Sequence, residues 1–172
     1  MLQSVVAKLK LDQANVATRY IVFEGKQHLD KNLERKLRGY VNPRARFIVL
    51  RDQDGADCKK LKSDLAAICK KARKKVVIRI ACRELEAFYL ADLLAVERGL
   101  AIQGVASKQG QAKYRNPDSL DHPAQELEKL TAHRYQKIAG SRAIAPHLDL
   151  GNTRSASFRN LVSAIRASHP KP

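Results

Sequence analysis

Two aspartates spaced by one residue, Asp52 and Asp54, are the side chains whose type and spacing best suit metal chemistry. They come just after four consecutive apolar residues, Phe47 to Leu50, which predict a short buried strand. Open α/β folds bind ligands beyond the carboxyl ends of parallel strands, so these carboxylates are placed where a hard divalent cation could be held. The alternative is that the pair only caps the next helix and forms the turn that Gly55 permits.

Further carboxylates follow two other predicted strands. Glu24 comes after residues 19–23, and Glu84 and Glu86 come after residues 76–81. In a parallel sheet these strand ends share one edge, so we expect the acids to gather there, where a cation or nearby lysines must offset their repulsion. Mg²⁺ or Mn²⁺ at such a site would polarise a phosphodiester and activate water. For Glu84 and Glu86 the alternative is ordinary helix-start chemistry, because the helix dipole favours carboxylates in the first turn.

The elements that must position these acids alternate between strand and helix. Apolar runs predict strands over 19–23, 47–50 and 76–81, and their short helical connections indicate a parallel sheet packed against helices. The expected helices are 1–11, 29–40, 58–72, 88–96, one starting at 121–123, parts of 135–148 and one after Ser155. Residues 99–117 are polar and glycine-bearing, which predicts a long loop.

The 172 residues suffice for one domain with a substantial core. We therefore expect a single α/β domain over 1–172. Residues 1–100 form its α/β core, a short parallel sheet flanked by helices, and residues 101–172 form a loop and a mostly helical extension.

The net charge of +16 favours polyanionic partners, and nucleic acid is the first candidate. A lysine run within residues 59–71 could follow phosphates, although such a run is also typical of a solvated helix face. Gly25 and Lys26 are similar to a phosphate-approach turn, in which glycine lets the backbone come close and lysine adds charge.

Several kinds of protein are not expected from this composition. The three cysteines form no Cys-x-x-Cys pair, which argues against a disulfide framework or a zinc site. No apolar run is long enough to span a bilayer, and the first residues lack the apolar length of a secretory signal. The sequence therefore predicts a cytoplasmic protein that does not enter membranes.

Several motifs taken together resemble an uncharacterised bacterial family with a Toprim-like fold, related to OLD-type and RloB-like nuclease domains. The motifs are Phe23-Glu24-Gly25-Lys26, Arg51-Asp52-Gln53-Asp54, Arg83-Glu84-Leu85-Glu86-Ala87, Lys113-Tyr114-Arg115-Asn116-Pro117 and Tyr135-Gln136-Lys137. The resemblance covers nearly the whole chain and implies a three-layer, Toprim-like domain.

The resemblance also implies a function and a set of site residues. It implies a Mg²⁺- or Mn²⁺-dependent, nuclease-like protein acting on nucleic-acid phosphodiesters, working in phage defence beside an ABC- or AAA-type ATPase. Asp52 and Asp54 would be the metal ligands. The supporting catalytic acids would be Glu84, Glu86 and Glu24, the last of which is similar to a glutamate of the family's second strand. The residues near nucleic acid would be Lys26, Arg51, Arg83, Lys113 and Arg115.

One departure from the family pattern leaves a second function open. The family's domain opens with a strand that ends in a glutamate, the general acid/base, whereas Met1 of this sequence aligns inside the following helix. We therefore expect the first strand to be missing. The alternative to an enzyme is a catalytically inactive module that binds nucleic acid or a partner protein. A missing strand would also leave a sheet edge through which two copies could pair.

Overall fold

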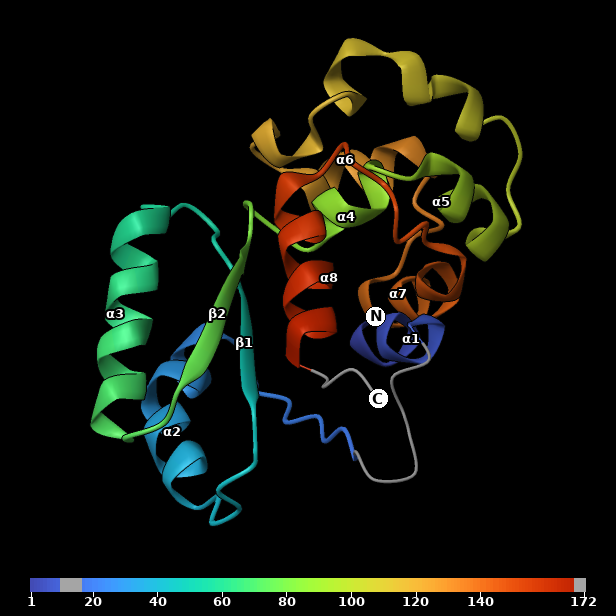
Figure 1. Ribbon diagram of the computed structural model, residues 1–172. Helices are drawn as coiled ribbons and strands as arrows, with labels where there is room; N and C mark the ends of the chain where they lie inside the picture. The colour runs from blue at the N-terminus through green and yellow to red at the C-terminus, as the bar shows by residue number, and fades with distance from the viewer. Residues whose placement is uncertain (10–16, 169–172) are drawn as a thin grey trace.

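The computed structural model describes residues 1–9 and 17–168, and Figure 1 shows the arrangement of its elements. The first half of the chain contains helices α1 (Leu2–Lys8) and α2 (Lys26–Arg38), strand β1 (Phe47–Asp52), helix α3 (Cys58–Lys71) and strand β2 (Val76–Ala81). The second half contains α4 (Glu86–Leu90), α5 (Leu93–Leu100), α6 (Pro123–Leu130), α7 (Lys137–Ile144) and α8 (Ala156–Ser168). Short 3₁₀ helices lie at Ala106–Gly110 (η1), Ala112–Tyr114 (η2), Pro117–Ser119 (η3) and Ala145–His147 (η4).

The two strands form a parallel pair in which Asp52, the last residue of β1, lies opposite Ala81, the last residue of β2. Successive side chains of a strand point to opposite faces. Val49 accordingly packs with residues of α2 and α3, whereas its neighbours Ile48 and Leu50 pack against the cluster that contains α8. Helices α2 and α3 thus lie on one face of the sheet and α8 on the other, as Figure 1 shows.

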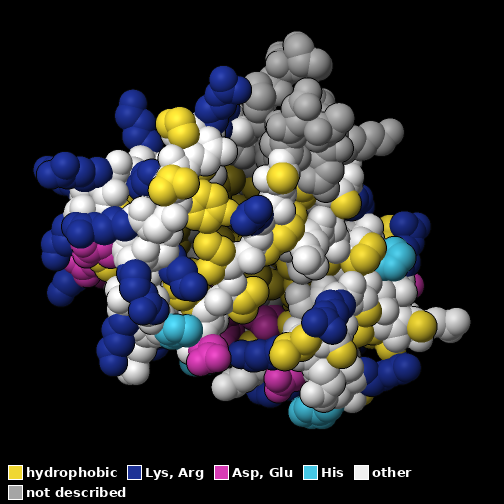
Figure 2. Space-filling model, turned by 90° about the horizontal axis from the view of Figure 1, so that it is seen from below, with side chains coloured by type: hydrophobic (Ala, Val, Ile, Leu, Met, Phe, Trp, Pro, Cys, Tyr) yellow, Lys and Arg dark blue, Asp and Glu magenta, His cyan; other side chains and the backbone are white. Residues whose placement is uncertain are grey.

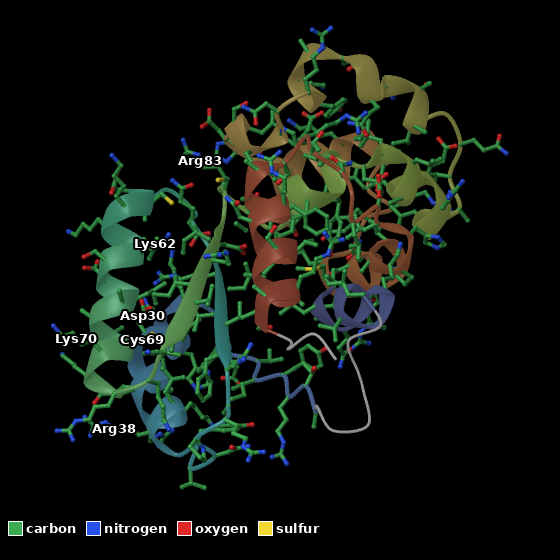
Figure 3. The ribbon with its side chains drawn as sticks, viewed as in Figure 1. Asp30, Arg38, Lys62, Cys69, Lys70 and Arg83 are labelled. Atoms are coloured by element: carbon green, nitrogen blue, oxygen red, sulfur yellow. The ribbon has the colours of Figure 1, made fainter. Side chains whose placement is uncertain are left out.

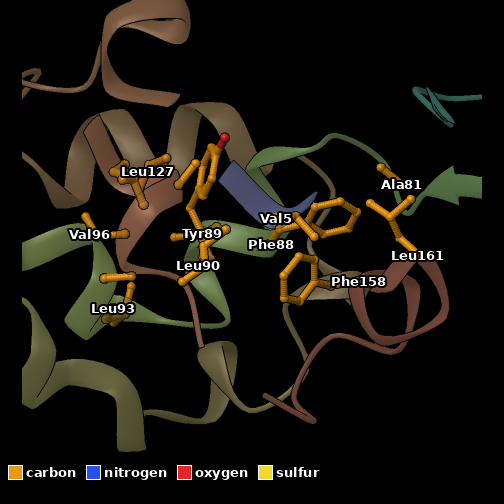
Figure 4. Close-up of a cluster of buried hydrophobic side chains, with 14 of the residues drawn as sticks. Val5, Ala81, Phe88, Tyr89, Leu90, Leu93, Val96, Leu127, Phe158 and Leu161 are labelled. Carbon is orange, nitrogen blue, oxygen red and sulfur yellow. The ribbon is translucent and has the colours of Figure 1, made fainter. Parts of the chain in front are cut away.

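Two hydrophobic clusters hold these layers together. The smaller one joins α2, α3 and the sheet through residues such as Leu33, Leu65 and Ile78. The larger one gathers side chains of α1, α4, α5, α6 and α8, and its centre is drawn in Figure 4. There the rings of Phe88 and Phe158 lie 5.1 Å apart between their centroids, which ties α4 to α8. The larger cluster anchors α4, the helix that follows β2 and carries Glu86.

The expected α/β class, short parallel sheet and helical C-terminal part are confirmed. The strand predicted over 19–23 is wrong, because residues 17–23 have no regular secondary structure. Within the described residues the sheet consists of β1 and β2 only, so this segment has no strand beside it. Val22 is 88% exposed, and only Phe23 packs against the smaller cluster.

Two further predictions need correction. The helix expected over 88–96 is two helices, because the Asp92 carboxylate accepts a hydrogen bond from the Ala95 amide at 3.1 Å and so starts a new helix, α5. The loop expected over 99–117 contains the short helices η1 and η2, and the Ala106 amide fastens it by donating to Glu97 at 2.8 Å. Residues 10 and 11 of the first predicted helix lie outside the described residues.

Across residues 1–9 and 17–168, no helix combines the length and the apolar character that crossing a membrane requires.

Candidate functional site

The segments that follow the two strands are bonded to each other beyond the sheet. The Gln53 amide donates to the Ala81 carbonyl at 2.9 Å, and the Asp54 amide donates to the Arg83 carbonyl at 2.7 Å. Asp54 and Arg83 both have positive φ, 53° and 58°, which few residues other than glycine adopt. Such strain is found preferentially at functional sites, where surrounding bonds maintain it. These bonds bring the acids after β1 and β2 to one rim, which we call the carboxylate rim and define as Asp52, Asp54, Glu84 and Glu86.

The acidity of Asp52 is strongly perturbed by its position at this rim. Burial, followed by the negative charges of Glu86, Asp54 and Glu84, raises the pKa of Asp52 to about 6. The Leu85 backbone amide opposes this by donating a hydrogen bond to the carboxylate, which lowers the pKa. The raised value means that ionised Asp52 is destabilised by its surroundings, and a bound cation would relieve that repulsion.

Glu86 is held by a tyrosine from a distant part of the chain. Its side chain is buried, with 6% exposure, and the Tyr135 hydroxyl donates to its Oε1 at 3.0 Å. Burial and the nearby Glu86 carboxylate raise the pKa of Tyr135, so this hydroxyl stays protonated and remains a donor. Tyr89 is buried beside Tyr135 and hydrogen-bonds Ser141. The orientation of Glu86 is therefore fixed by the packing of α4 against the segment before α7.

The other two acids of the rim already have partners. Glu84 accepts a hydrogen bond at 2.8 Å from the Ala124 amide in the first turn of α6, so the helix-start alternative applies to it, although to a different helix. Asp54 forms an ion pair with Lys26, whose Nζ lies 3.1 Å from its Oδ2. Glu84 and Asp54 therefore both take part in bonds that stabilise the fold.

In the described part of the chain, no group of three or more His, Cys, Asp or Glu side chains is arranged to hold a metal ion. A cage made only of protein ligands is therefore not formed here. Mg²⁺, however, commonly binds through one or two carboxylates and completes its shell with water and substrate phosphates. The rim fits that second mode through Asp52 and Glu86, whose charges act on each other and neither of which forms an ion pair within residues 1–9 and 17–168.

The residues predicted to contact nucleic acid lie in three separate places. Lys26 lies at the carboxylate rim through Asp54, and Arg83 follows β2 and forms an ion pair with Asp121 at 3.1 Å. Arg51 instead points toward α2, where it bonds Asp30 at 2.7 Å with 13% of its side chain exposed. It lines a cleft of about 530 Å³ between α2 and α3 that includes no acid of the carboxylate rim.

Lys113 and Arg115, which were also predicted to contact nucleic acid, form bonds with residues outside the carboxylate rim. Lys113 forms an ion pair with Glu126 at 2.7 Å, and the Arg115 Nε donates to the Gly110 carbonyl at 3.3 Å. Glu24 does not end a strand. It precedes α2, its side chain is 94% exposed, and its charge is not among those that raise the pKa of Asp52.

Two structural contributors were not predicted. Tyr135 supports Glu86 across 49 residues of sequence, and no local pattern around Tyr135 indicates this contact. Asp118 accepts hydrogen bonds from the Ser155 hydroxyl at 2.7 Å and from the Ser157 amide at 2.8 Å, which fixes the start of α8 beside the rim. The cap that Ser155 provides to α8 was visible in the sequence, and the Phe158 amide donates to its hydroxyl at 3.0 Å.

Comparison with known families gives one match, which covers residues 3–166. Neither the curated proteins nor the solved structures include a match to this chain. The matched family is described as a domain of unknown function, so it assigns no activity to the carboxylate rim. Because the match extends over nearly the whole sequence, the chain belongs to the family described as Domain of unknown function (DUF4276).

Proposed function

We propose that this protein is a metal-dependent enzyme that cleaves phosphodiester bonds of nucleic acid at the carboxylate rim. One observation carries the proposal: Asp52 is half-buried at the carboxyl end of a parallel strand, near three other carboxylates whose charges act on it, in a chain whose net charge is +16. A carboxylate whose pKa is shifted by burial and by neighbouring charges is a candidate for a functional group. The resemblance to Toprim-like nucleases, noted from the sequence, agrees with this reading.

Two acids of the rim and two residues that contact the rim have defined tasks in this proposal. Asp52 and Glu86 hold the cation, and Tyr135 keeps the Glu86 carboxylate oriented by donating to its Oε1. Lys26 supplies a positive charge beside Asp54 that can meet a phosphate oxygen. When bound, Mg²⁺ or Mn²⁺ would polarise the phosphate and make a coordinated water easier to deprotonate. Asp52 must lose its proton before it can bind the cation, so we expect metal affinity to increase from pH 5 to pH 7.

The direct test is the substitution Asp52→Asn, which removes the charge with little change in size. Isothermal titration should detect Mg²⁺ or Mn²⁺ binding to the unmodified protein and a loss of at least about tenfold in the variant, together with loss of cleavage of a labelled duplex. Asp64→Asn is a matched control, because Asp64 is an exposed aspartate on α3. Unchanged metal binding and cleavage in Asp52→Asn would exclude this site.

A second candidate function is a non-catalytic module that binds nucleic acid or a partner protein. It is favoured by the absence, within residues 1–9 and 17–168, of a group of three metal-ligating side chains, and by the bonds that already occupy Asp54 and Glu84. This function predicts salt-sensitive binding in the presence of a chelator and no cleavage with either cation. An ATPase partner, which the family resemblance implies, belongs to either candidate.

A further inference from the structure

The chain's positive charge is concentrated in one layer of the fold. Residues 26–75, which form α2, β1 and α3, contain sixteen Lys and Arg and six Asp and Glu, so this segment contributes ten of the sixteen net positive charges. Figure 2 shows Lys and Arg side chains gathered over the side of the molecule formed by α2 and α3. The remainder of the chain is more than twice as long and supplies the other six charges.

We propose that α3 and the turn after it bind the phosphate backbone of double-stranded nucleic acid. The surface, which we call the α3 basic face, consists of Lys59, Lys62, Lys70, Lys71, Arg73 and Lys75. All six side chains are exposed, and none forms an ion pair with an acid among the residues that the structure describes. Figure 3 labels Lys62 and Lys70 along α3.

The spacing of these lysines suits a duplex. Lys59 and Lys62 lie in the first turns of α3, and Lys70 and Lys71 lie in the last. The eleven residue-to-residue steps from Lys59 to Lys70 correspond to about 16 Å along the helix axis. The major groove of B-form DNA is about 12 Å wide, so the two lysine groups can contact the phosphates that border it on both sides. Between them lie small side chains, Ser63, Ala66 and Ala67, which let the helix come close.

The chemistry of α3 favours the backbone of a duplex over single strands. Proteins that bind single strands add aromatic side chains on which the bases stack, and α3 contains no aromatic residue. Contacts from Lys and Arg side chains to phosphates fix a protein on the duplex and carry no sequence information. Binding should therefore be independent of sequence, depend steeply on salt, and be stronger for the double strand, whose charge density is higher.

The N-terminal end of the α3 basic face lies next to the carboxylate rim. Three residues separate Asp54 from Cys58, the first residue of α3, so a backbone held at Lys59 lies beside the rim acids. The inference rests on the proposed function for what happens to the bound nucleic acid, because it supplies the substrate of that site. Binding itself requires no metal, so the two proposals can be tested apart.

Fluorescence anisotropy measures the binding of a labelled duplex that has about 30 base pairs and a random sequence. EDTA is present, so the measurement tests the α3 basic face without metal. The variant K59Q/K62Q/K70Q/K71Q should bind at least about tenfold more weakly, and the slope of log K against log salt should fall by about 3 to 4. The control K108Q/K129Q/R134Q/K137Q removes the same charge from exposed positions outside the layer and should change affinity by less than about threefold. Circular dichroism verifies that both variants are folded.

Three outcomes would overturn the inference: no binding by the unmodified protein, an equal loss in both variants, or tighter binding of the single strand than of the duplex. Selective loss in the α3 variant supports it whether or not cleavage occurs. If that selective loss is seen while neither Mg²⁺ nor Mn²⁺ produces cleavage, the proposed function fails and the basic face stands.

Discussion

Asp52 is a residue at which the proposed function and stability conflict. Its pKa is raised from 3.8 in the unfolded chain to about 6 in the fold, so between these pH values the folded protein binds more protons than the unfolded chain. The free energy of unfolding contributed by Asp52 therefore falls as pH rises from about 4 to about 6 and is constant above. At neutral pH the penalty amounts to about 2–3 kcal/mol.

Asp52→Asn should consequently raise the melting temperature at pH 7.5 and leave it nearly unchanged at pH 4, where the aspartate is protonated. A gain of about 2 kcal/mol corresponds to roughly 4–8 °C for a chain of this size. Differential scanning fluorimetry at the two pH values measures this. Added Mg²⁺ should stabilise the unmodified protein and not the variant. Equal melting temperatures at pH 7.5 would mean that Asp52 is not under repulsion.

Tyr135 provides a second prediction, because its hydroxyl is the hydrogen-bond donor that the structure gives to the buried Glu86 carboxylate. Tyr135→Phe should reduce the free energy of unfolding by about 1–3 kcal/mol, since a buried acceptor loses its partner. Tyr40→Phe is the matched control, because Tyr40 is only half-buried and its ring packs edge-on against Phe47. Denaturant titration compares the two variants. Equal effects would show that the Tyr135–Glu86 bond contributes little.

At the scale of elements, Gly99 decides how closely α5 and α7 can pack. A Cβ at Gly99 would lie 2.6 Å from the Ile144 Cα and 2.7 Å from the Ala143 carbonyl oxygen. Gly99→Ala should therefore destabilise the protein by about 1–3 kcal/mol, although alanine favours an isolated helix. Gly39→Ala, where the nearest contact is an ordinary 3.5 Å, should be tolerated. Thermal melts test both, and a melting temperature for Gly99→Ala at or above that of the unmodified protein would contradict the packing argument.

The elements that the sequence predicts correctly are those with a strong local pattern. The leucines of α2 and the apolar stripe of α3 define their helices without knowledge of the rest of the fold. The segment 19–23 has equally strong local preferences for a strand, and it fails because a strand needs a neighbour to pair with. The break between α4 and α5 depends on one side chain, Asp92, whose capping bond the apolar pattern hides.

The candidate site was predictable only in part for a related reason. Asp52, Asp54, Glu84 and Glu86 follow correctly predicted strands, so their gathering at one rim follows from parallel topology. The predicted position of Glu24 at this rim depended on a strand over residues 19–23, which does not form. The partners that distinguish the acids from one another, such as Lys26 for Asp54 and Ala124 for Glu84, come from distant segments whose docking no local pattern encodes.

For the whole molecule, the notable feature is an uneven charge distribution. Positive charge is concentrated on α2 and α3, while the carboxylate rim lies at the end of the sheet where α3 begins. Figure 3 marks the two ends of this layer, with Arg83 near the end of β2 and Arg38 at the opposite end. Repulsion within the basic layer opposes folding, and a polyanion that binds this layer would relieve it.

The two ends of α3 allow this cost to be measured. Lys59 and Lys62 lie near the positive end of the helix dipole, so both the dipole and the net charge disfavour them. Lys70 and Lys71 lie near the negative end, where the dipole favours them and offsets the repulsion.

At low salt, K59Q/K62Q should therefore raise the free energy of unfolding by about 0.5–1 kcal/mol, whereas K70Q/K71Q should leave it unchanged or lower it. In about 1 M NaCl the difference should vanish, because screening removes both effects while glutamine and lysine have similar helix propensities. Urea titration at the two salt concentrations measures this difference. If K59Q/K62Q gains stability and loses affinity for duplex, Lys59 and Lys62 reduce stability and serve binding. A loss of stability at low salt would contradict the prediction that the dipole and the net charge disfavour these two lysines.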